Sequence, residues 1–224
     1  MKSVLITGAT SGLGEDLSIS LLKKYKVFCL GRNEKKLREL KSLGCKVLKV
    51  DFLKVKGEDL IKILEDFCPS VDILINNAGI FPIKNLKQSS VEDYDNCFNV
   101  NVKVPFLLMN YYLEKMRKKG LGHVINILSS SAYNGSKDTG LYCASKHALL
   151  GLTRSAFLEY RGTGVRVSSV SPGSMQTPMG KTDTRQDYST FIEVKEVTNF
   201  IENMLELNGS MVVDEVRLNR FEIR

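Results

Sequence analysis

Short apolar runs alternate with amphipathic stretches along most of the chain. The runs are apolar at nearly every position and contain many β-branched residues, as parallel strands do when helices cover both faces of their sheet. They predict strands over residues 3–7, 26–30, 46–50, 73–76, 123–128 and 166–170. A further strand is predicted over residues 212–216.

The stretches between these runs have the periodicity of helices that bury one face. They predict helices over residues 12–24, 34–43, 58–67, 91–119, 141–161 and 193–207, with an interruption in the fourth. Alternating strands and helices with right-handed crossovers give an α/β fold with a doubly wound parallel sheet, which binds ligands at the carboxyl ends of its strands. Residues 172–188 are rich in Ser, Thr, Gly and Pro and are predicted to form one long loop near that edge.

The length and composition indicate one soluble domain. A chain of 224 residues can bury the core of one α/β domain and is short for two, so we expect residues 1–224 to form a single domain. With 43% hydrophobic and 25% charged residues, it differs from disordered chains. The first apolar run is too short for a signal peptide or a membrane span, so a cytoplasmic protein without a membrane partner is expected. Reduced thiols there also fit the odd number of cysteines, which form no CxxC pair: Cys29, Cys45, Cys68, Cys97 and Cys143.

The formal net charge of +7 raises the question of nucleic-acid binding, because basic surfaces attract phosphate through counterion release. The lysines are dispersed, however, and the densest cluster, at residues 115–119, closes a predicted helix whose C-terminal end favours cations. The charge is therefore interpreted as ordinary solvation with local attraction of an anionic cofactor, and no nucleic-acid partner is expected.

A glycine-rich turn follows the first predicted strand and opens a helix. Its glycines let the backbone approach a pyrophosphate closely, and the N–H groups and dipole at the start of the helix attract that anion. This position between a strand and a helix predicts a nucleotide site, with a plain tight turn as the alternative. The turn has the spacing GxxxGxG and consists of Thr7, Gly8, Ala9, Thr10, Ser11, Gly12, Leu13 and Gly14.

Tyr142 and Lys146 are four residues apart in a predicted helix, so they lie on one face, one turn from each other. A free tyrosine has a pKa of about 10, which is too high for efficient proton exchange at neutral pH. A neighbouring ammonium favours the phenolate, so we expect Lys146 to lower the pKa of Tyr142. Such a pair is commonplace and often structural, and only together with the glycine-rich turn does it indicate catalysis.

Four motifs occur along the chain in one order: TGxxxGxG at 7–14, NNAG at 76–79, YxxxK at 142–146 and PG…TP at 172–178. This arrangement resembles the short-chain dehydrogenase/reductase family over nearly the whole chain. The resemblance implies a single Rossmann-fold domain and an oxidoreductase that transfers a hydride between a nicotinamide cofactor and a carbonyl or alcohol substrate, with Tyr142 as general acid/base. A non-catalytic, NADP-binding regulator of the same fold is the alternative, and the presence of both Tyr142 and Lys146 argues against it.

The resemblance also implies two further catalytic residues. A serine commonly precedes the tyrosine by thirteen residues at a strand end, which points to Ser129, with Ser130 and Ser131 as neighbours if the register differs by one. Asn101 lies in an NxN segment and would bend its helix and hold a water that connects Lys146 to solvent. Asparagine is unfavourable inside a helix, and Pro105 follows, so a purely structural kink is the alternative.

The end of the second strand bears on the choice of cofactor. An acid there would hold the ribose 2′-hydroxyl of NAD, whereas an arginine would hold the 2′-phosphate of NADP. Gly31 occupies the expected acidic position and Arg32 follows it, so NADP is favoured over NAD, with a surface arginine as the alternative. The resemblance adds Asp51 at the adenine and Lys146 beside Tyr142 at the nicotinamide ribose. It adds further contacts from Asn77, Ala78 and Gly79 on the adenosine side, and from Pro172, Gly173, Met175 and Thr177 at the nicotinamide.

The remaining expectations concern metal, substrate and assembly. His123 and His147 have no partners at metal-ligand spacing, so no metal site is predicted. The substrate pocket is expected from residues 80–86, 132–141 and 181–188, with three basic residues as possible anion contacts: Lys84, Lys137 and Arg185. The resemblance suggests a homodimer through the helices at 91–119 and 141–161. The end of the chain lacks the glycine pair that many relatives carry near the last strand, which argues against tetramer packing there.

Overall fold

The computed structural model describes residues 1–207 and 209–221, and its described part contains one parallel sheet of seven strands. The strands lie in the order β3-β2-β1-β4-β5-β6-β7. Successive strands are added on one side of β1 up to β3 and on its other side from β4 onward, so the strand order reverses between β1 and β4. Parallel strands that reverse order in this way leave a crevice at their carboxyl ends. The strand bounds are β1 Ser3–Thr7, β2 Lys26–Gly31, β3 Lys46–Lys49, β4 Ile73–Asn76, β5 Gly122–Ile127, β6 Val165–Pro172 and β7 Glu215–Leu218.

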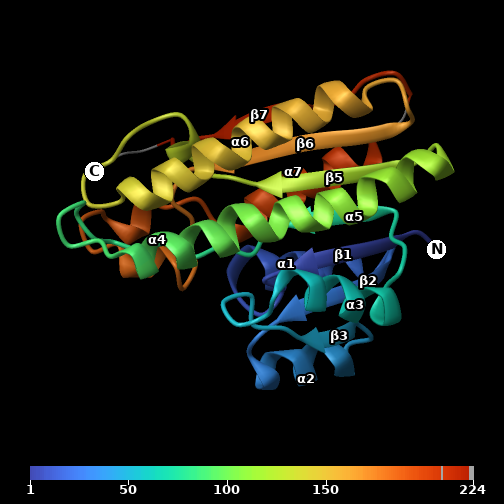
Figure 1. Cartoon of the computed structure of the whole chain (residues 1–224), viewed down its shortest axis with the longest axis horizontal. Helices are drawn as coiled ribbons and strands as arrows, with labels where there is room; N and C mark the ends of the chain where they lie inside the picture. The colour runs from blue at the N-terminus through green and yellow to red at the C-terminus, as the bar shows by residue number, and fades with distance from the viewer. Residues whose placement is uncertain (208, 222–224) are drawn as a thin grey trace.

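Helices cover both faces of the sheet, with α5 and α6 in front and α7 behind in the view of Figure 1. Alternate residues of β1 show why: Leu5 packs in one apolar cluster with α3 and α5, whereas Val4 and Ile6 pack in a second with α1 and α7. Among the described residues, no helix is long and apolar enough to cross a membrane. The α-helices are α1 Gly12–Leu21, α2 Glu34–Ser42, α3 Gly57–Phe67, α4 Val91–Phe98, α5 Val104–Lys119, α6 Gly140–Tyr160 and α7 Val194–Glu206.

The predicted doubly wound α/β fold is confirmed, and the first six strands lie within two residues of their predicted ends. The prediction for the last strand was wrong, because β7 covers Glu215–Leu218 rather than 212–216. The apolar run at 212–213 precedes the ladder, and the Val213 carbonyl accepts a hydrogen bond from the Ser168 hydroxyl at 2.6 Å. The strand begins only where it pairs with β6, from Ser169 opposite Glu215.

The interruption predicted in the fourth helix is a π-helical turn, Asn99–Lys103, between α4 and α5. Pro105 follows at the first turn of α5, where proline is tolerated because the missing N–H is not needed there. The predicted loop at 172–188 also differs in part. Pro172 is the last residue of β6, and the loop contains a short 3-10 helix, Gly180–Thr182.

Candidate active site

The glycine-rich turn after β1 is tied to the loop after β4. The Asn77 side-chain amide donates hydrogen bonds to the carbonyls of Thr7, at 2.9 Å, and Gly8, at 3.3 Å. The Thr7 hydroxyl accepts hydrogen bonds from the backbone N–H groups of Asn77 and Ala78, both at 3.0 Å. A Cβ at Gly14 would lie 2.4 Å from the Asn77 amide nitrogen. Glycine is therefore required at 14 for the two loops to pack this closely.

The start of α1 faces the loop that follows β6. Gly12 has a φ of +52°, which favours glycine, and a Cβ there would lie 2.9 Å from the Thr177 methyl group. Ser11 precedes the helix in an extended conformation, and its side chain makes no capping hydrogen bond. The first-turn N–H groups therefore remain available to an anion, as a pyrophosphate cradle requires.

Two cavities of about 130 Å³ each follow one another along the carboxyl ends of the strands and share Gly8, Ser11, Ala78 and Gly79. Arg32 and Asp51 line the outer one, and Lys146 lines the inner one. An elongated dinucleotide whose pyrophosphate lies at the glycine-rich turn fits this row. The predicted cofactor residues that line it are Gly8, Thr10, Ser11, Gly12, Leu13, Arg32, Asp51, Asn77, Ala78, Gly79, Tyr142, Lys146, Met175 and Thr177.

Three predicted cofactor residues lie outside these two cavities. Gly14 packs beneath Asn77, as described above. Pro172 and Gly173 line a third and larger cavity of about 390 Å³. This cavity adjoins the inner one, because both are lined by Leu128, Tyr142, Met175, Thr177 and Met179.

The outer end of the row carries an unpaired cation. Arg32 is exposed, and within residues 1–207 and 209–221 its guanidinium has no ion-pair or hydrogen-bond partner. Gly31 is buried beneath Thr10, and a Cβ at Gly31 would lie 2.4 Å from the Thr10 methyl carbon. One oxygen of the Asp51 carboxylate accepts a hydrogen bond from the Leu53 N–H at 3.1 Å.

Tyr142 and Ser129 meet at the wall of the 390 Å³ cavity. Tyr142 is 9% exposed, and its ring packs edge-to-face on Phe81 with 4.7 Å between ring centres. The Ser129 hydroxyl interacts with the Tyr142 side chain and lowers its pKa, and it accepts a hydrogen bond from the Ser131 N–H at 3.1 Å. Ser130 and Ser131 also line this cavity.

The expected lowering of the Tyr142 pKa by Lys146 was wrong for this structure. Burial raises the pKa of Tyr142 to about 12, and the hydrogen bond with Ser129 opposes that shift only in part. A buried phenolate loses its hydration, so the neutral phenol is favoured. Tyr142 therefore carries its proton at neutral pH, as a proton donor must.

Lys146 lies one turn along α6 from Tyr142, with its ammonium 5.7 Å from the centre of the tyrosine ring. The side chain is buried, and Nζ donates a hydrogen bond to the Ile127 carbonyl at 2.9 Å. Burial lowers the pKa of Lys146 to about 8. The hydrogen bond to Ile127 directs the ammonium toward the end of β5, and Lys146 lines the inner cavity. No carboxylate contributes to the shift of its pKa.

Residues 2–188 match the model of the short chain dehydrogenase family. The chain belongs to this family. A short-chain dehydrogenase is an oxidoreductase built on the fold described above, so the expected fold and family are confirmed.

Three similar proteins illustrate the family. An uncharacterized oxidoreductase from Thermotoga maritima is 40% identical over 183 residues, which are 79% of this chain and 72% of the relative. The structure of a 4-hydroxyisoleucine dehydrogenase complexed with NADH is 28% identical, has a TM-score of 0.84, and matches over 98% of this chain and 97% of the other. The structure of an alcohol dehydrogenase from the archaeon Thermococcus sibiricus, complexed with 5-hydroxy-NADP, is 25% identical, has a TM-score of 0.85, and matches over 100% of this chain and 98% of the other. Solved structures similar to this chain therefore include a complex with NADH and a complex with 5-hydroxy-NADP.

In this short-chain dehydrogenase Asn101 is buried in the π-helical turn and does not line the cavities described above. Its Oδ1 accepts a hydrogen bond from the Ile80 N–H at 2.9 Å, and its amide donates to the Ile80 carbonyl and to the Ser145 hydroxyl, both at 3.0 Å. The side chain thus fixes the loop after β4 against α6. The water relay expected at this position stays a prediction.

Of the three predicted anion contacts of the substrate pocket, the structure places Arg185 at the large cavity and Lys84 and Lys137 outside its lining. The Lys84 ammonium pairs with Asp93 at 2.7 Å and does not line the large cavity. Lys137 is exposed, and its carbonyl accepts a hydrogen bond from Arg185. Arg185 does line the cavity, but Asp183 pairs with its guanidinium at 2.7 Å. Arg185 and Asp183 are only two residues apart, so this ion pair could have been suggested by the sequence.

Sequence reasoning missed Arg220, which lines the 390 Å³ cavity. It follows β7 by two residues, and β7 pairs in parallel with β6. A prediction that the last strand pairs with the sixth would have placed the residues after it at the carboxyl edge. The predicted bounds for that strand were too early to suggest this.

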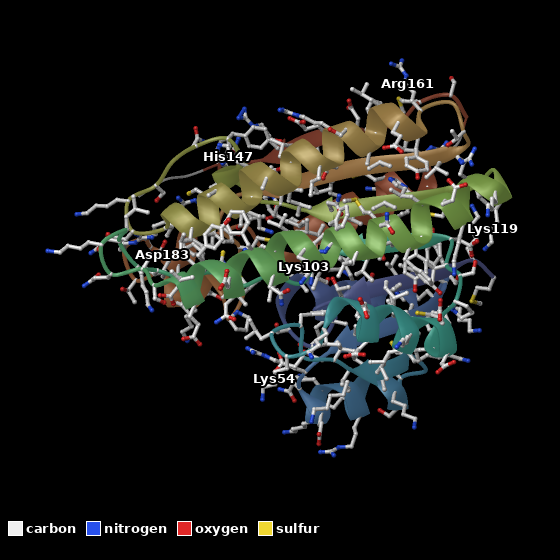
Figure 2. All side chains as sticks on the ribbon, viewed as in Figure 1. Lys54, Lys103, Lys119, His147, Arg161 and Asp183 are labelled. Atoms are coloured by element: carbon white, nitrogen blue, oxygen red, sulfur yellow. The ribbon has the colours of Figure 1, made fainter. Side chains whose placement is uncertain are left out.

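The two histidines lie away from the cavities. His123 is buried in β5, where its Nε2 hydrogen-bonds the Ser168 hydroxyl at 2.8 Å. His147 lies on the exposed side of α6, as Figure 2 shows, and its Nδ1 hydrogen-bonds the Cys143 carbonyl at 2.8 Å. Their contacts are those of structural residues.

Proposed function

We propose that this chain is an NADP-dependent oxidoreductase that interconverts a carbonyl compound and its alcohol, with Tyr142 as the general acid/base. The carrying observation is the position of Tyr142, which lines both the 390 Å³ cavity, together with Ser129, and the inner cavity of the row at the glycine-rich turn. One domain would hold cofactor and substrate. Membership of the short-chain dehydrogenase family supports the reaction class.

Residues of the inner cavity, among them Lys146, Met175 and Thr177, would hold the nicotinamide end of the cofactor, which would supply a hydride to the carbonyl carbon. Ser129 and Tyr142 donate hydrogen bonds to the carbonyl oxygen and orient it. As the carbon–oxygen double bond becomes single, Tyr142 transfers its phenolic proton to that oxygen, which completes the alcohol. The Lys146 ammonium favours the phenolate left behind, and Asn101 holds the loop after β4 that borders the site.

The tyrosine is tested by Tyr142→Phe, which removes only the hydroxyl. We expect turnover to fall by roughly 10²- to 10⁴-fold, the range of general acid–base contributions, while NADPH affinity stays within about twofold. Tyr111→Phe is the matched control, because the Tyr111 hydroxyl is buried and has no hydrogen-bond partner within the described part of the chain. Turnover of Tyr142→Phe close to that of the Tyr111 control would refute the assignment.

The preference for NADP is supported by the unpaired Arg32 and by the tight packing of Gly31 beneath Thr10, which leaves no room for an acidic side chain. We propose that Arg32 binds the 2′-phosphate and that Asp51 borders the adenine. Arg32→Ala should raise the KM for NADPH by roughly 10- to 100-fold and leave the KM for NADH unchanged, because a charge-assisted hydrogen bond contributes about 1.5–3 kcal/mol. Arg38→Ala, which removes an exposed arginine of α2 that does not line the outer cavity, is the control. Equal effects on both cofactors would contradict the assignment.

A homodimer through α5 and α6 is proposed from the family resemblance and from two exposed apolar side chains, Phe106 on α5 and Leu158 on α6. Sedimentation equilibrium should show a dimer that Leu158→Glu weakens. Leu43→Glu, at an exposed apolar residue that follows α2, serves as the control. A monomeric wild-type protein would exclude the dimer.

A cytoplasmic location is proposed from the cysteines, all five of which are buried and unpaired. Titration of the denatured protein, isolated with a thiol-blocking reagent present, should therefore count five free thiols. Fewer free thiols would argue for an oxidising compartment.

A further inference from the structure

The 390 Å³ cavity receives a basic residue from the segment that follows the last strand. Because β6 and β7 are parallel, their carboxyl ends lie side by side, and the Gly173 N–H donates a hydrogen bond to the Leu218 carbonyl at 2.7 Å. A Cβ at Gly173 would lie 3.7 Å from the Arg220 backbone nitrogen. Because the two segments pass so closely, Arg220 lines the same cavity as Tyr142.

Neutral groups hold the Arg220 guanidinium in place. Nη1 donates a hydrogen bond to the Thr190 hydroxyl at 3.1 Å, and Nη2 donates to the Gln186 side-chain oxygen at 2.7 Å. The guanidinium carbon lies 5.2 Å from the centre of the Phe191 ring. An arginine has five N–H donors, so several remain for a ligand. In the part of the chain that the structure describes, no carboxylate lies within ion-pair distance of Arg220.

Arg220 is the charged residue of the cavity lining that has no ion-pair partner in the part of the chain that the structure describes. The other charged lining residues are Asp183 and Arg185. They form an ion pair at 2.7 Å, and Asp138, which does not line the cavity, lies 3.9 Å from the same Arg185 guanidinium. The Gln186 amide then links the pair to Arg220, because Gln186 Nε2 donates a hydrogen bond to the Asp183 carboxylate at 2.7 Å. Figure 2 shows Asp183 at the same end of the molecule as the start of α6, away from the amino ends of the strands.

We propose that the substrate is an acid whose carboxylate binds Arg220 while its carbonyl or alcohol group lies at Tyr142 and Ser129. The inference rests on the proposed function and names the substrate class of that site. A carboxylate matches the planar guanidinium of Arg220, which has no ion-pair partner among the described residues and can donate two parallel hydrogen bonds. The phosphates of the cofactor are not expected here, because Arg220 lines neither of the two smaller cavities.

The first test compares oxo acids with their methyl esters. Pyruvate, acetoacetate and levulinate place the carbonyl at increasing separation from the carboxylate, and each methyl ester keeps the carbon skeleton but removes the charge. NADPH oxidation by the wild-type enzyme should show a lower KM for the acid than for the ester in at least one pair, by roughly 10- to 100-fold. Esters that are reduced as well as their acids in every pair would overturn the proposal.

Two variants separate binding from a structural role of Arg220. Arg220→Met removes the guanidinium, whereas Thr190→Asp keeps it and adds a carboxylate where the Thr190 hydroxyl now accepts its hydrogen bond. Both should raise the KM for the acid by roughly tenfold or more and leave the kcat and the ester kinetics nearly unchanged. Arg217→Met is the control, because Arg217 lies over the Tyr133 ring at 3.7 Å and does not line the cavity.

The outcomes distinguish this inference from the proposed function. A purely structural role of Arg220 would change the acid and ester kinetics alike, which overturns the inference while NADPH oxidation continues. If NADPH binds but none of the six probes oxidises it, the proposed function fails. The inference is then decided by calorimetric titration of levulinate into the NADPH complex, where binding to wild type and its loss in Arg220→Met support a carboxylate site, and equal or absent binding refutes it.

Discussion

Replacement of Lys146 by methionine is expected to stabilise the fold while it removes turnover. The Lys146 ammonium is buried, and its pKa falls from the ordinary 10.5 to about 8 because burial removes hydration from the charged form. At about 1.36 kcal/mol per pH unit, that difference corresponds to a cost of about 3 kcal/mol for keeping the charge in the folded protein at pH 7. Methionine has a similar length and carries no charge.

The hydrogen bond from Lys146 to the Ile127 carbonyl offsets part of this gain. The variant loses that bond, which costs about 1 kcal/mol, so the net stabilisation is about 2 kcal/mol at pH 7. Urea denaturation monitored by circular dichroism should therefore place the midpoint of Lys146→Met roughly 1 M higher than that of wild type.

The pH dependence supplies a second readout with a definite sign. Between pH 8 and 10.5 the unfolded chain binds a proton at Lys146 that the folded chain has released, so wild-type stability rises with pH relative to the variant. The advantage of Lys146→Met should therefore disappear above about pH 10.5, and comparing both proteins in a Tyr142→Phe background removes any effect of the tyrosine on this difference. A variant less stable than wild type at pH 7, or a difference that does not change with pH, would refute the reasoning.

Three further changes test other parts of the structure. Asn101→Ala leaves the partly buried N–H and carbonyl of Ile80 without their partner, so urea denaturation should show a loss of about 2–4 kcal/mol. A loss below about 1 kcal/mol would contradict the assigned bonds. Gly14→Ala would place a Cβ 2.4 Å from the Asn77 amide, and NADPH fluorescence titration should show at least roughly tenfold weaker binding; unchanged affinity would show that the loops yield freely. Burial lowers the pKa of His123 to about 4, so between pH 6.5 and 4 the unfolded state binds a proton that the folded state does not. The free energy of unfolding of wild type should therefore fall by up to about 3 kcal/mol relative to His123→Gln over this range. Parallel pH curves for the two proteins would argue that His123 stays solvated.

The sequence predicted those parts of the fold that local pattern determines. Six strands and the break at Asn101 follow from apolar runs and from an asparagine and a proline inside a helix. The last strand was misplaced because residues 212–213 are β-branched yet lie before the ladder, and only the pairing of Ser169 with Glu215 sets where β7 begins. Register between distant strands is a tertiary property that local propensity does not contain.

For the candidate site, helical spacing placed Tyr142 and Lys146 together, and the family resemblance pointed to Ser129, which the structure places beside Tyr142 at the same cavity. The sequence did not predict the direction of the Tyr142 pKa, because burial raises that pKa and burial is known only from packing. Arg220 was missed for a related reason. Its place depends on which strand neighbours which, and not on any motif around it.

The hydrogen bonds between Thr7 and Asn77 belong to the part of the chain that would bind the nucleotide, which is distinct from the part around Arg220 that would bind the substrate. They lock the loops that would hold the dinucleotide to each other, whereas the wall around Arg220 is built from a loop and the segment after β7 that are joined largely through side chains. Substitutions in that wall can therefore change which substrates bind without lowering the affinity for the nucleotide. Lineages of such proteins can therefore acquire new specificities one surface residue at a time, and laboratory redesign can begin at the same positions.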